Sequence, residues 1–174
     1  MAKLKWFDVS LDVIKKKIPI IGVDLANIEN KTILYDMTRE LKGKMAEAKF
    51  KVKIKDKNPC GEIVYFGLVQ NYVRRLVRKG TSPVEDSFFA VSKDGVRLQV
   101  KPLFVTRKKV VRNIRKKIRE RGRELIIKLI ENNNKDIIFD SIINYVWQKQ
   151  ILTELKKIYP LLICEIRRIE VKQK

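Results

Sequence analysis

One stretch near the middle of the chain repeats apolar and basic residues with the period of an α-helix. Between Thr106 and Leu129, winding at about 100° per residue separates the two kinds of side chain onto opposite sides. The apolar side consists of Val110, Val111, Ile114, Ile118, Leu125 and Leu129. The basic side consists of Lys108, Arg112, Arg115, Lys116, Arg119 and Arg123. The pattern predicts a long amphipathic helix that packs on the domain through its apolar side.

The basic side of this helix is short of acids. A helix that only faces water usually mixes charges so that residues four apart pair, yet the polar face between Arg107 and Arg123 holds a single acid, Glu120. A solvated surface helix is the ordinary interpretation of a charged face. The excess of one sign favours the other interpretation, in which an anionic partner lies against the helix.

Strict alternation marks a β-strand earlier in the chain. Phe50, Val52 and Ile54 fall on one face, and the other face carries Lys49, Lys51, Lys53 and Lys55. The lysines either protect a sheet edge from further pairing or contact phosphates, and the sequence leaves both interpretations open. A turn over residues 56–61 and an apolar run to Val69 complete a predicted hairpin.

A second hairpin is predicted by an Asp-Gly pair between two β-like runs. Residues 87–92 and 96–105 flank Lys93-Asp94-Gly95, a strong hairpin signal. Pro102 cannot donate a ladder hydrogen bond, which predicts a sheet edge or a bulge at that position. The exposed side of the second run is basic, with Arg97 and Lys101.

Other N-terminal segments have weaker signals. Strands are predicted at Leu4–Val9, with Trp6 or Phe7 as an apolar anchor, and at Thr32–Met37; for Trp6, a core position is favoured over a base-stacking one. A helical turn is predicted at Leu11–Lys17, before Pro19. A short helix with Asn71 as its N-cap runs towards Gly80.

The C-terminal part is predicted to be helix followed by strand. Residues 136–159 form one helix, or two with a kink near Trp147–Lys149, and Pro160 ends the pattern. Residues 161–171 have strand composition. Their apolar register slips between Ile166 and Ile169, which predicts a bulge at Arg167-Arg168.

Composition supports an anionic partner and argues against catalysis. The chain has 40 Lys plus Arg against 20 Asp plus Glu, a formal charge of +20 on 174 residues, and nucleic acid is the usual partner of such a charge. Histidine is absent, and Cys60 and Cys164 have no metal-ligand spacing, so we expect two buried or half-buried thiols, no cofactor, no metal and no enzymatic activity. No apolar run is long enough to span a membrane and no signal peptide is evident, so a cytoplasmic location is expected.

The length and the apolar content of 45% predict one domain over residues 1–174. Residues 1–105 are expected to be mainly β with one short basic helix. Residues 106–174 are expected to be mainly helical with a C-terminal strand. The predicted fold class is therefore α+β.

Several segments, in order along nearly the whole chain, resemble a known family. They are the Trp6-Phe7-Asp8-Val9 motif, Ile21-Gly22, residues 41–43 (LKG), 72–86 (YVRRLVRKGTSPVED), 92–101 (SKDGVRLQVK), 111–117 (VRNIRKK) and 156–171 (KKIYPLLICEIRRIEV). Together they are similar to the archaeal and eukaryotic small-subunit ribosomal protein family eS-one, also called S-three-A. The chain departs from the family at Val69-Gln70-Asn71, where Thr-Arg-Asp is usual. The lysine-rich N-terminal tail and the C-terminal extension of eukaryotic members are lacking, which favours an archaeal source.

The resemblance implies a structural constituent of the small ribosomal subunit, on the platform near the messenger RNA exit. The implied fold is an antiparallel, barrel-like sheet with helices packed outside. The implied partners are 16S rRNA and neighbouring platform proteins, with messenger RNA nearby and no membrane or small-molecule substrate. Binding would be by phosphate neutralisation. The residues expected to bind RNA are Arg74, Arg75, Arg78, Lys79, Arg97, Lys101, Arg107, Lys108, Lys109, Arg112, Arg115, Lys116, Arg119, Arg123, Arg167 and Arg168.

Two other functions share some of these features. A free-standing RNA chaperone or translation regulator would have the same charge distribution. An RNA-processing enzyme would need carboxylates around a metal, for which the candidates are Asp24, Asp36, Glu40, Glu85 and Asp86, but their spacing has no metal-binding motif.

Overall fold

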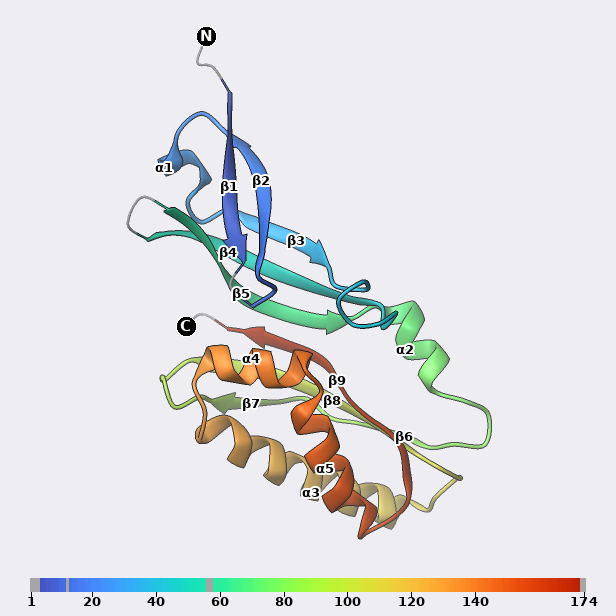
Figure 1. Cartoon of the computed structure of the whole chain (residues 1–174). Coiled ribbons are helices and arrows are strands. Elements are labelled where there is room, and N and C mark those ends of the chain that lie inside the picture. The colour runs from blue at the N-terminus through green and yellow to red at the C-terminus, as the bar shows by residue number, and fades with distance from the viewer. Residues whose placement is uncertain (1–3, 12, 56–57, 173–174) are drawn as a thin grey trace. The chain divides into compact units, whose positions relative to one another are not determined.

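The computed structural model describes residues 4–11, 13–55 and 58–172. The chain divides into two compact units, Met1–Phe66 and Gly67–Lys174, each of which is described by itself (Figure 1). The α+β class is confirmed, including the C-terminal helix followed by a strand. Among the described residues the strand pairings leave the sheet open, so the expected barrel is not closed. The single domain stays a prediction.

The first unit is built from hairpins. Strand β1 (Lys5–Leu11) pairs antiparallel with β2 (Lys16–Gly22), and a short helix, α1 (Leu25–Ile28), leads to β3 (Thr32–Asp36). Strand β4 (Ala46–Lys55) lies between β3 and β5 (Asn58–Leu68), whose last residues reach into the second unit. Part of the predicted turn, residues 56–57, lies outside the described residues.

One expectation for this unit is wrong, and one of two open interpretations does not hold for part of β4. Within the predicted helical turn at Leu11–Lys17, Asp12 lies outside the described residues. The described residues are instead the end of β1, a turn and the start of β2, because seven cross-strand pairs outweigh a weak local helix pattern. Lys49 and Lys51 do not protect an edge, because this part of β4 pairs with β3 as well as belonging to a strand that pairs with β5. Phe50 and Val52 are fully buried, as the alternation predicted.

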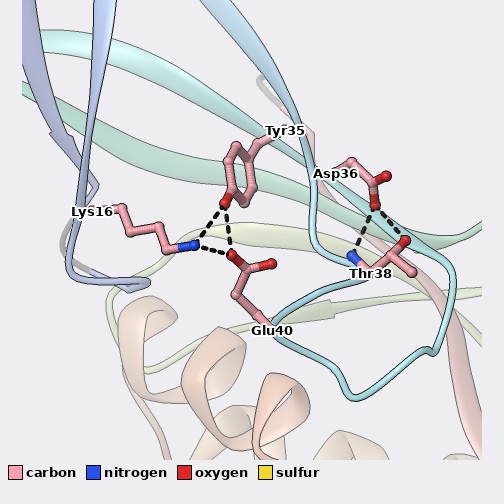
Figure 2. A network of polar contacts seen from close by, with 5 residues as sticks. All are labelled: Lys16, Tyr35, Asp36, Thr38 and Glu40. Carbon is pink, nitrogen blue, oxygen red and sulfur yellow. Dashed lines mark hydrogen bonds and ion pairs between the residues drawn. The ribbon is translucent and has the colours of Figure 1, made fainter.

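A polar network joins the β1–β2 hairpin to β3. Figure 2 shows the Lys16 ammonium donating to Glu40 Oε1 at 2.5 Å, while the Tyr35 hydroxyl donates to the same oxygen at 2.6 Å. Burial alone would raise the pKa of Glu40, but the hydrogen bonds from Lys16 and Tyr35 lower it below its usual value. The carboxylate therefore stays charged and holds the hairpin in place.

The second unit packs helices on strands. Helix α2 (Gln70–Leu76) precedes β6 (Pro83–Glu85) and β7 (Phe88–Val91), which both pair antiparallel with β8 (Arg97–Thr106). Helices α3 (Arg112–Glu131), α4 (Lys135–Ile143) and α5 (Val146–Lys156) follow, and β9 (Leu161–Val171) pairs antiparallel with β8. Helix α3 packs against β6, β7 and α5, and α5 packs against β9.

Both predicted irregularities of this unit are confirmed. Lys101 faces Arg168 and Pro102 faces Ile166, so Arg167 is the extra residue of a β-bulge. Because β8 is paired on both sides, Pro102 marks a bulge and not an edge. The predicted hairpin at Asp94-Gly95 is also present, with Gly95 at φ +75° and Val91 facing Arg97.

Helix ends differ from the predictions. Helix α2 begins after Val69 with no side-chain cap, so Asn71 is not its N-cap. The C-terminal helical region breaks before the expected kink, at Tyr145, which has a left-handed φ of +63°. Two side chains hold this break: Tyr145 Oη donates to the Cys164 carbonyl at 3.2 Å, and Gln148 Nε2 donates to the Ile142 carbonyl at 2.8 Å. Both thiols are free cysteines, Cys60 half-buried and Cys164 buried.

Candidate nucleic-acid interface

Helix α3 carries the main basic surface, and its packing explains how that surface is presented. The helix begins at Arg112 and not at Thr106, which ends β8, so the first six residues of the predicted helix are strand end and loop. The buried stripe is Ile118, Gly122, Ile126 and Ile130. Ile114, Leu125 and Leu129 are half-buried, and Val111 is 65% exposed, so Val111 does not anchor the helix as expected.

Gly122 lets α3 approach the strands closely. A Cβ atom at this position would lie 2.7 Å from two ring carbons of Phe104 on β8, closer than side chains normally pack. The absence of a side chain therefore sets the distance between helix and sheet. This contact also fixes the rotation of α3, because Ile118 and Ile126 lie one turn away on either side.

The opposite face of α3 forms an open basic groove. Its lining consists of Arg112, Arg115, Lys116, Arg119, Glu120 and Arg123. Positions 112, 115, 119 and 123 step by three, four and four residues, so their side chains rise along one edge of the helix. We call Arg112, Arg115, Lys116, Arg119 and Arg123 the α3 stripe.

Most cations of the α3 stripe have no acidic partner. Arg112, Arg115 and Arg119 are exposed and form no ion pair with any residue that the structure describes. Lys116 lies 3.8 Å from Glu120, a loose and exposed pair. The first turn of α3 holds no acid and contains Arg112 and Arg115. These two cations lie near the positive end of the helix dipole, an arrangement that an external anion would relieve.

Arg123 differs from the rest of the stripe because Asp86 holds it. Arg123 Nε and Nη2 donate to the two Asp86 oxygens at 2.8 and 2.7 Å, and the guanidinium also lies 5.6 Å from the centre of the Phe88 ring. Burial would raise the pKa of Asp86, but the hydrogen bonds from Arg123 and from the Ser87 N–H, with the charges of Arg123 and Arg119, lower it. Arg123 thus keeps only part of its guanidinium for another anion.

A second depression, on the other side of Arg119, mixes both signs of charge. It is lined by Glu85, Asp86, Ser87, Lys101, Pro102, Arg119 and Arg167. Arg119 therefore lines both depressions, and the fold brings Lys101 and Arg167 close to the α3 stripe. The acids of the β6–β7 turn make this side less attractive to an anion than the groove on α3.

The two arginines of the β9 bulge have partners within the chain. Arg167 donates to Glu85 at 2.9 Å through Nη1 and to Gln70 Oε1 at 3.0 Å through Nη2. Arg168 donates to Glu170 at 2.7 Å. The sequence predicted both as RNA contacts. In the structure Arg167 connects β9 to β6 and to α2, and Arg168 pairs with a residue of its own strand.

The remaining predicted residues lie in three places. Arg107, Lys108 and Lys109 are exposed in the loop before α3, which is held because Thr106 Oγ1 lies 2.7 Å from the Lys108 carbonyl and Ser82 Oγ accepts from the Val110 N–H at 3.2 Å. Arg97 stacks over the exposed Phe89 ring at 4.3 Å from its centre. The four cations of the α2 region are all exposed; Arg74 and Arg75 are in the last turn of α2, and Arg78 and Lys79 follow its end.

Some functional features were missed from the sequence. Lys117 and Arg121 are also exposed cations of α3, but they were not among the predicted RNA-binding residues. Asp86 was considered only as a metal ligand, and its pairing with Arg123 spans 37 residues, so no local pattern predicts it. Within the described ranges no group of three or more carboxylates or cysteines could hold a metal ion. No described helix is long and apolar enough to cross a membrane.

Comparison with known proteins gives one consistent family. Residues 24–174 match the model of the Ribosomal S3Ae family. Curated relatives are named small ribosomal subunit protein eS1. The Haloarcula marismortui protein is 29% identical over 143 residues, which cover 82% of this chain and 65% of the relative. The Methanothrix thermoacetophila protein is 27% identical over 98% of this chain and 84% of the relative. The Methanopyrus kandleri protein is 34% identical over 60% of this chain and 51% of the relative.

Proposed function

Because the chain belongs to the Ribosomal S3Ae family, we propose that it is a structural constituent of the small ribosomal subunit that binds 16S rRNA through the α3 stripe. The family is the one that the sequence motifs identified, and the matched relatives are archaeal, in agreement with the expected source. The expected position is the subunit platform near the messenger RNA exit, in the cytoplasm, beside other platform proteins. The matched parts cover 65% of the Haloarcula relative and 51% of the Methanopyrus one.

The observation that carries the proposal is the line of unpaired arginines on α3. Arg112, Arg115 and Arg119 face an open groove, while the opposite side of the same helix is fully buried at Ile118 and Ile126. A helix anchored in this way presents its guanidinium groups in a fixed row, and each group can bind a phosphate in a bidentate manner. Release of counterions from the RNA would drive the binding.

The cations of the second unit can be ordered by their expected contribution to RNA binding, according to whether an acid of this chain already pairs with them. The stripe residues Arg112, Arg115, Lys116 and Arg119 come first, together with the exposed loop cations Arg107, Lys108 and Lys109 that precede α3 in the chain. Arg123, Arg167 and Arg168 come last because each is bound to an acid of this chain. The α2 cations form a separate exposed group, for which we propose a contact with a different stretch of RNA.

The mechanism is positioning of RNA and involves no chemical step. Cations neutralise phosphates and fix the orientation of an rRNA helix, whatever its base sequence. We propose no catalytic role, no cofactor and no small-molecule substrate.

The test is cofractionation with small ribosomal subunits. We expect the chain to stay with the 30S particle through a high-salt wash, because a component buried among rRNA helices has many simultaneous contacts. Release into the supernatant at that salt concentration would instead favour the free-standing RNA chaperone or translation regulator. A matched Arg115→Ala, Arg119→Ala variant should enter particles less efficiently than the unsubstituted chain.

A further inference from the structure

Trp6 is exposed at the open end of the β1–β2 hairpin. The sequence favoured a core position for it, but 68% of its surface is exposed, whereas the chain's other tryptophan, Trp147, is 4% exposed in the second unit. Its neighbour Phe7 is half-buried and takes the anchoring position. A large aromatic side chain left in solvent has no role in the packing of this unit.

The strand register shows that Trp6 belongs to an outward face. Trp6 is opposite Ile21, which is 44% exposed, and two residues further along Asp8 is opposite Pro19, both exposed. The alternate positions point inward, where Val9 and Leu11 are fully buried. The outward face therefore presents a flat indole ring beside an aliphatic side chain.

The hairpin as a whole carries an excess of lysines. Of the described residues of the hairpin, Lys5, Lys15, Lys16 and Lys17 are basic and Asp8 is the acid. Lys16 is bound to Glu40, but Lys5 and Lys17 form no ion pair with a described residue. The alternation places Lys17 on the outward face with Trp6, and it places the exposed Lys5 with the alternate positions. The excess of positive charge favours an anionic occupant over a purely apolar one.

The hairpin is held firmly enough to act as a platform. Its seven cross-strand pairs are joined by a parallel bridge from Ser10 to Cys60 on β5 and by the contacts of Lys16 with Tyr35 and Glu40 (Figure 2). Figure 1 shows β1 and β2 extending past the ends of β4 and β5. A ring on such a platform needs little ordering when a ligand binds.

We propose that this outward face binds single-stranded RNA, with Trp6 stacking on an unpaired nucleobase while Lys17, on the same face, contacts a phosphate of the strand. Aromatic stacking combined with nearby cations is the usual way in which proteins bind unpaired nucleotides. The inference rests on the proposed rRNA binding and adds to it a second surface of different chemistry, which recognises bases and not only phosphates.

The two tryptophans allow a direct fluorescence test on the full chain. The probe is a labelled single-stranded oligo(A) of about 12 nucleotides, within the usual span of such sites. Binding followed by the label should be accompanied by quenching of Trp6 emission, while buried Trp147 continues to emit. An abasic strand of the same length should bind more weakly without quenching, and Trp6→Phe should remove the quenching signal while keeping most of the affinity.

Affinity gives the second readout. Trp6→Ala should weaken oligo(A) binding roughly 5- to 150-fold, the range expected for one lost stacking interaction. The dependence of affinity on salt should not change, because no phosphate contact is removed. Since Trp6 is exposed, the variant should fold, and its circular dichroism spectrum and melting temperature would check this. Bound oligo(A) with unchanged emission and an unchanged affinity of Trp6→Ala would overturn the inference.

The remaining outcomes separate this inference from the proposed function. If the Arg115→Ala, Arg119→Ala variant shows a flattened salt dependence of RNA binding while Trp6→Ala binds oligo(A) normally, the α3 interface stands and the stacking surface is wrong. If Trp6→Ala binds oligo(A) normally but no longer enters small-subunit particles, the face docks a protein, which also overturns RNA stacking. Quenching with an unchanged α3 variant supports the Trp6 surface and refutes the α3 stripe.

Discussion

Helix α3 and the bulge of β9 both display arginines, but the two groups have different surroundings. On α3, Arg115 and Arg119 face a groove and have no acidic partner among the described residues. On β9, Arg167 is bound by Glu85 and Gln70, and Arg168 is bound by Glu170. In a chain of net charge +20 the few acids are therefore a guide to function, because they identify the cations used within the fold. We propose that the cations that lack acids are the ones available to RNA.

The largest expected effect on stability comes from truncating a buried side chain that packs α3 onto the domain. Ile118 is fully buried, so Ile118→Ala should lower the free energy of unfolding by roughly 2 to 5 kcal/mol. Urea denaturation followed by circular dichroism would measure it, with Ile118→Val as the milder control. The RNA affinity of the folded fraction should keep its salt dependence. A change in that dependence would mean that packing and binding on α3 are not separable.

Replacing Asp86 should make Arg123 resemble the unpaired arginines of the stripe. Asp86→Asn removes a partly buried bidentate ion pair and should cost about 1 to 2 kcal/mol of stability. The freed guanidinium should then steepen the plot of log affinity against log salt by roughly 0.7 to 0.9 units, the change expected when one more phosphate is neutralised. An unchanged slope together with lower stability would restrict Arg123 to a structural role.

The same ion pair predicts a pH dependence. The pKa of Asp86 is lower in the folded protein than its ordinary value of 3.8, so its contribution is fully present above that value and is lost as pH falls through the folded pKa. The stability difference between the unsubstituted chain and Asp86→Asn should therefore be constant between about pH 5 and 7 and shrink below about pH 4. A difference that persisted unchanged to about pH 2 would contradict the ion pair.

The smallest effect is expected at the bulge. Arg167→Ala removes a partly exposed pair with Glu85 and should change stability by at most about 1 kcal/mol. Because Arg167 is already neutralised within the chain, the salt dependence of RNA binding should stay within experimental error. A flattening comparable to that of an α3 arginine would remove the distinction between the two groups.

Local signals were sufficient for much of the fold. The Asp94-Gly95 hairpin follows from turn chemistry, and the bulge at Arg167 follows from the slipped apolar register. The start of α3 did not follow, because Thr106 is held in β8 by bonds to Ser82, which is 24 residues away. The buried stripe was misjudged because Gly122, which has no side chain, carries no hydrophobic signal although it contacts Phe104.

The candidate site was predictable only as a set of cations. Amphipathic spacing placed Arg112, Arg115 and Arg119 on one face correctly. The division into free and paired cations depends on contacts between distant segments, such as Asp86 with Arg123, which no pattern along the chain reveals. The exposure of Trp6 was likewise missed, because its neighbour Phe7 fits the same hydrophobic signal and takes the inward position.

The most direct test is a filter-binding titration of two matched double variants against a platform rRNA fragment at several salt concentrations. We expect Arg115→Ala, Arg119→Ala to flatten the plot of log affinity against log salt by roughly 1.5 to 2 units without lowering the melting temperature. Arg167→Ala, Arg168→Ala, which removes the same charge, should leave the slope nearly unchanged. Equal slopes for the α3 variant and the unsubstituted chain, or equal flattening in both variants, would contradict the assignment of RNA binding to α3.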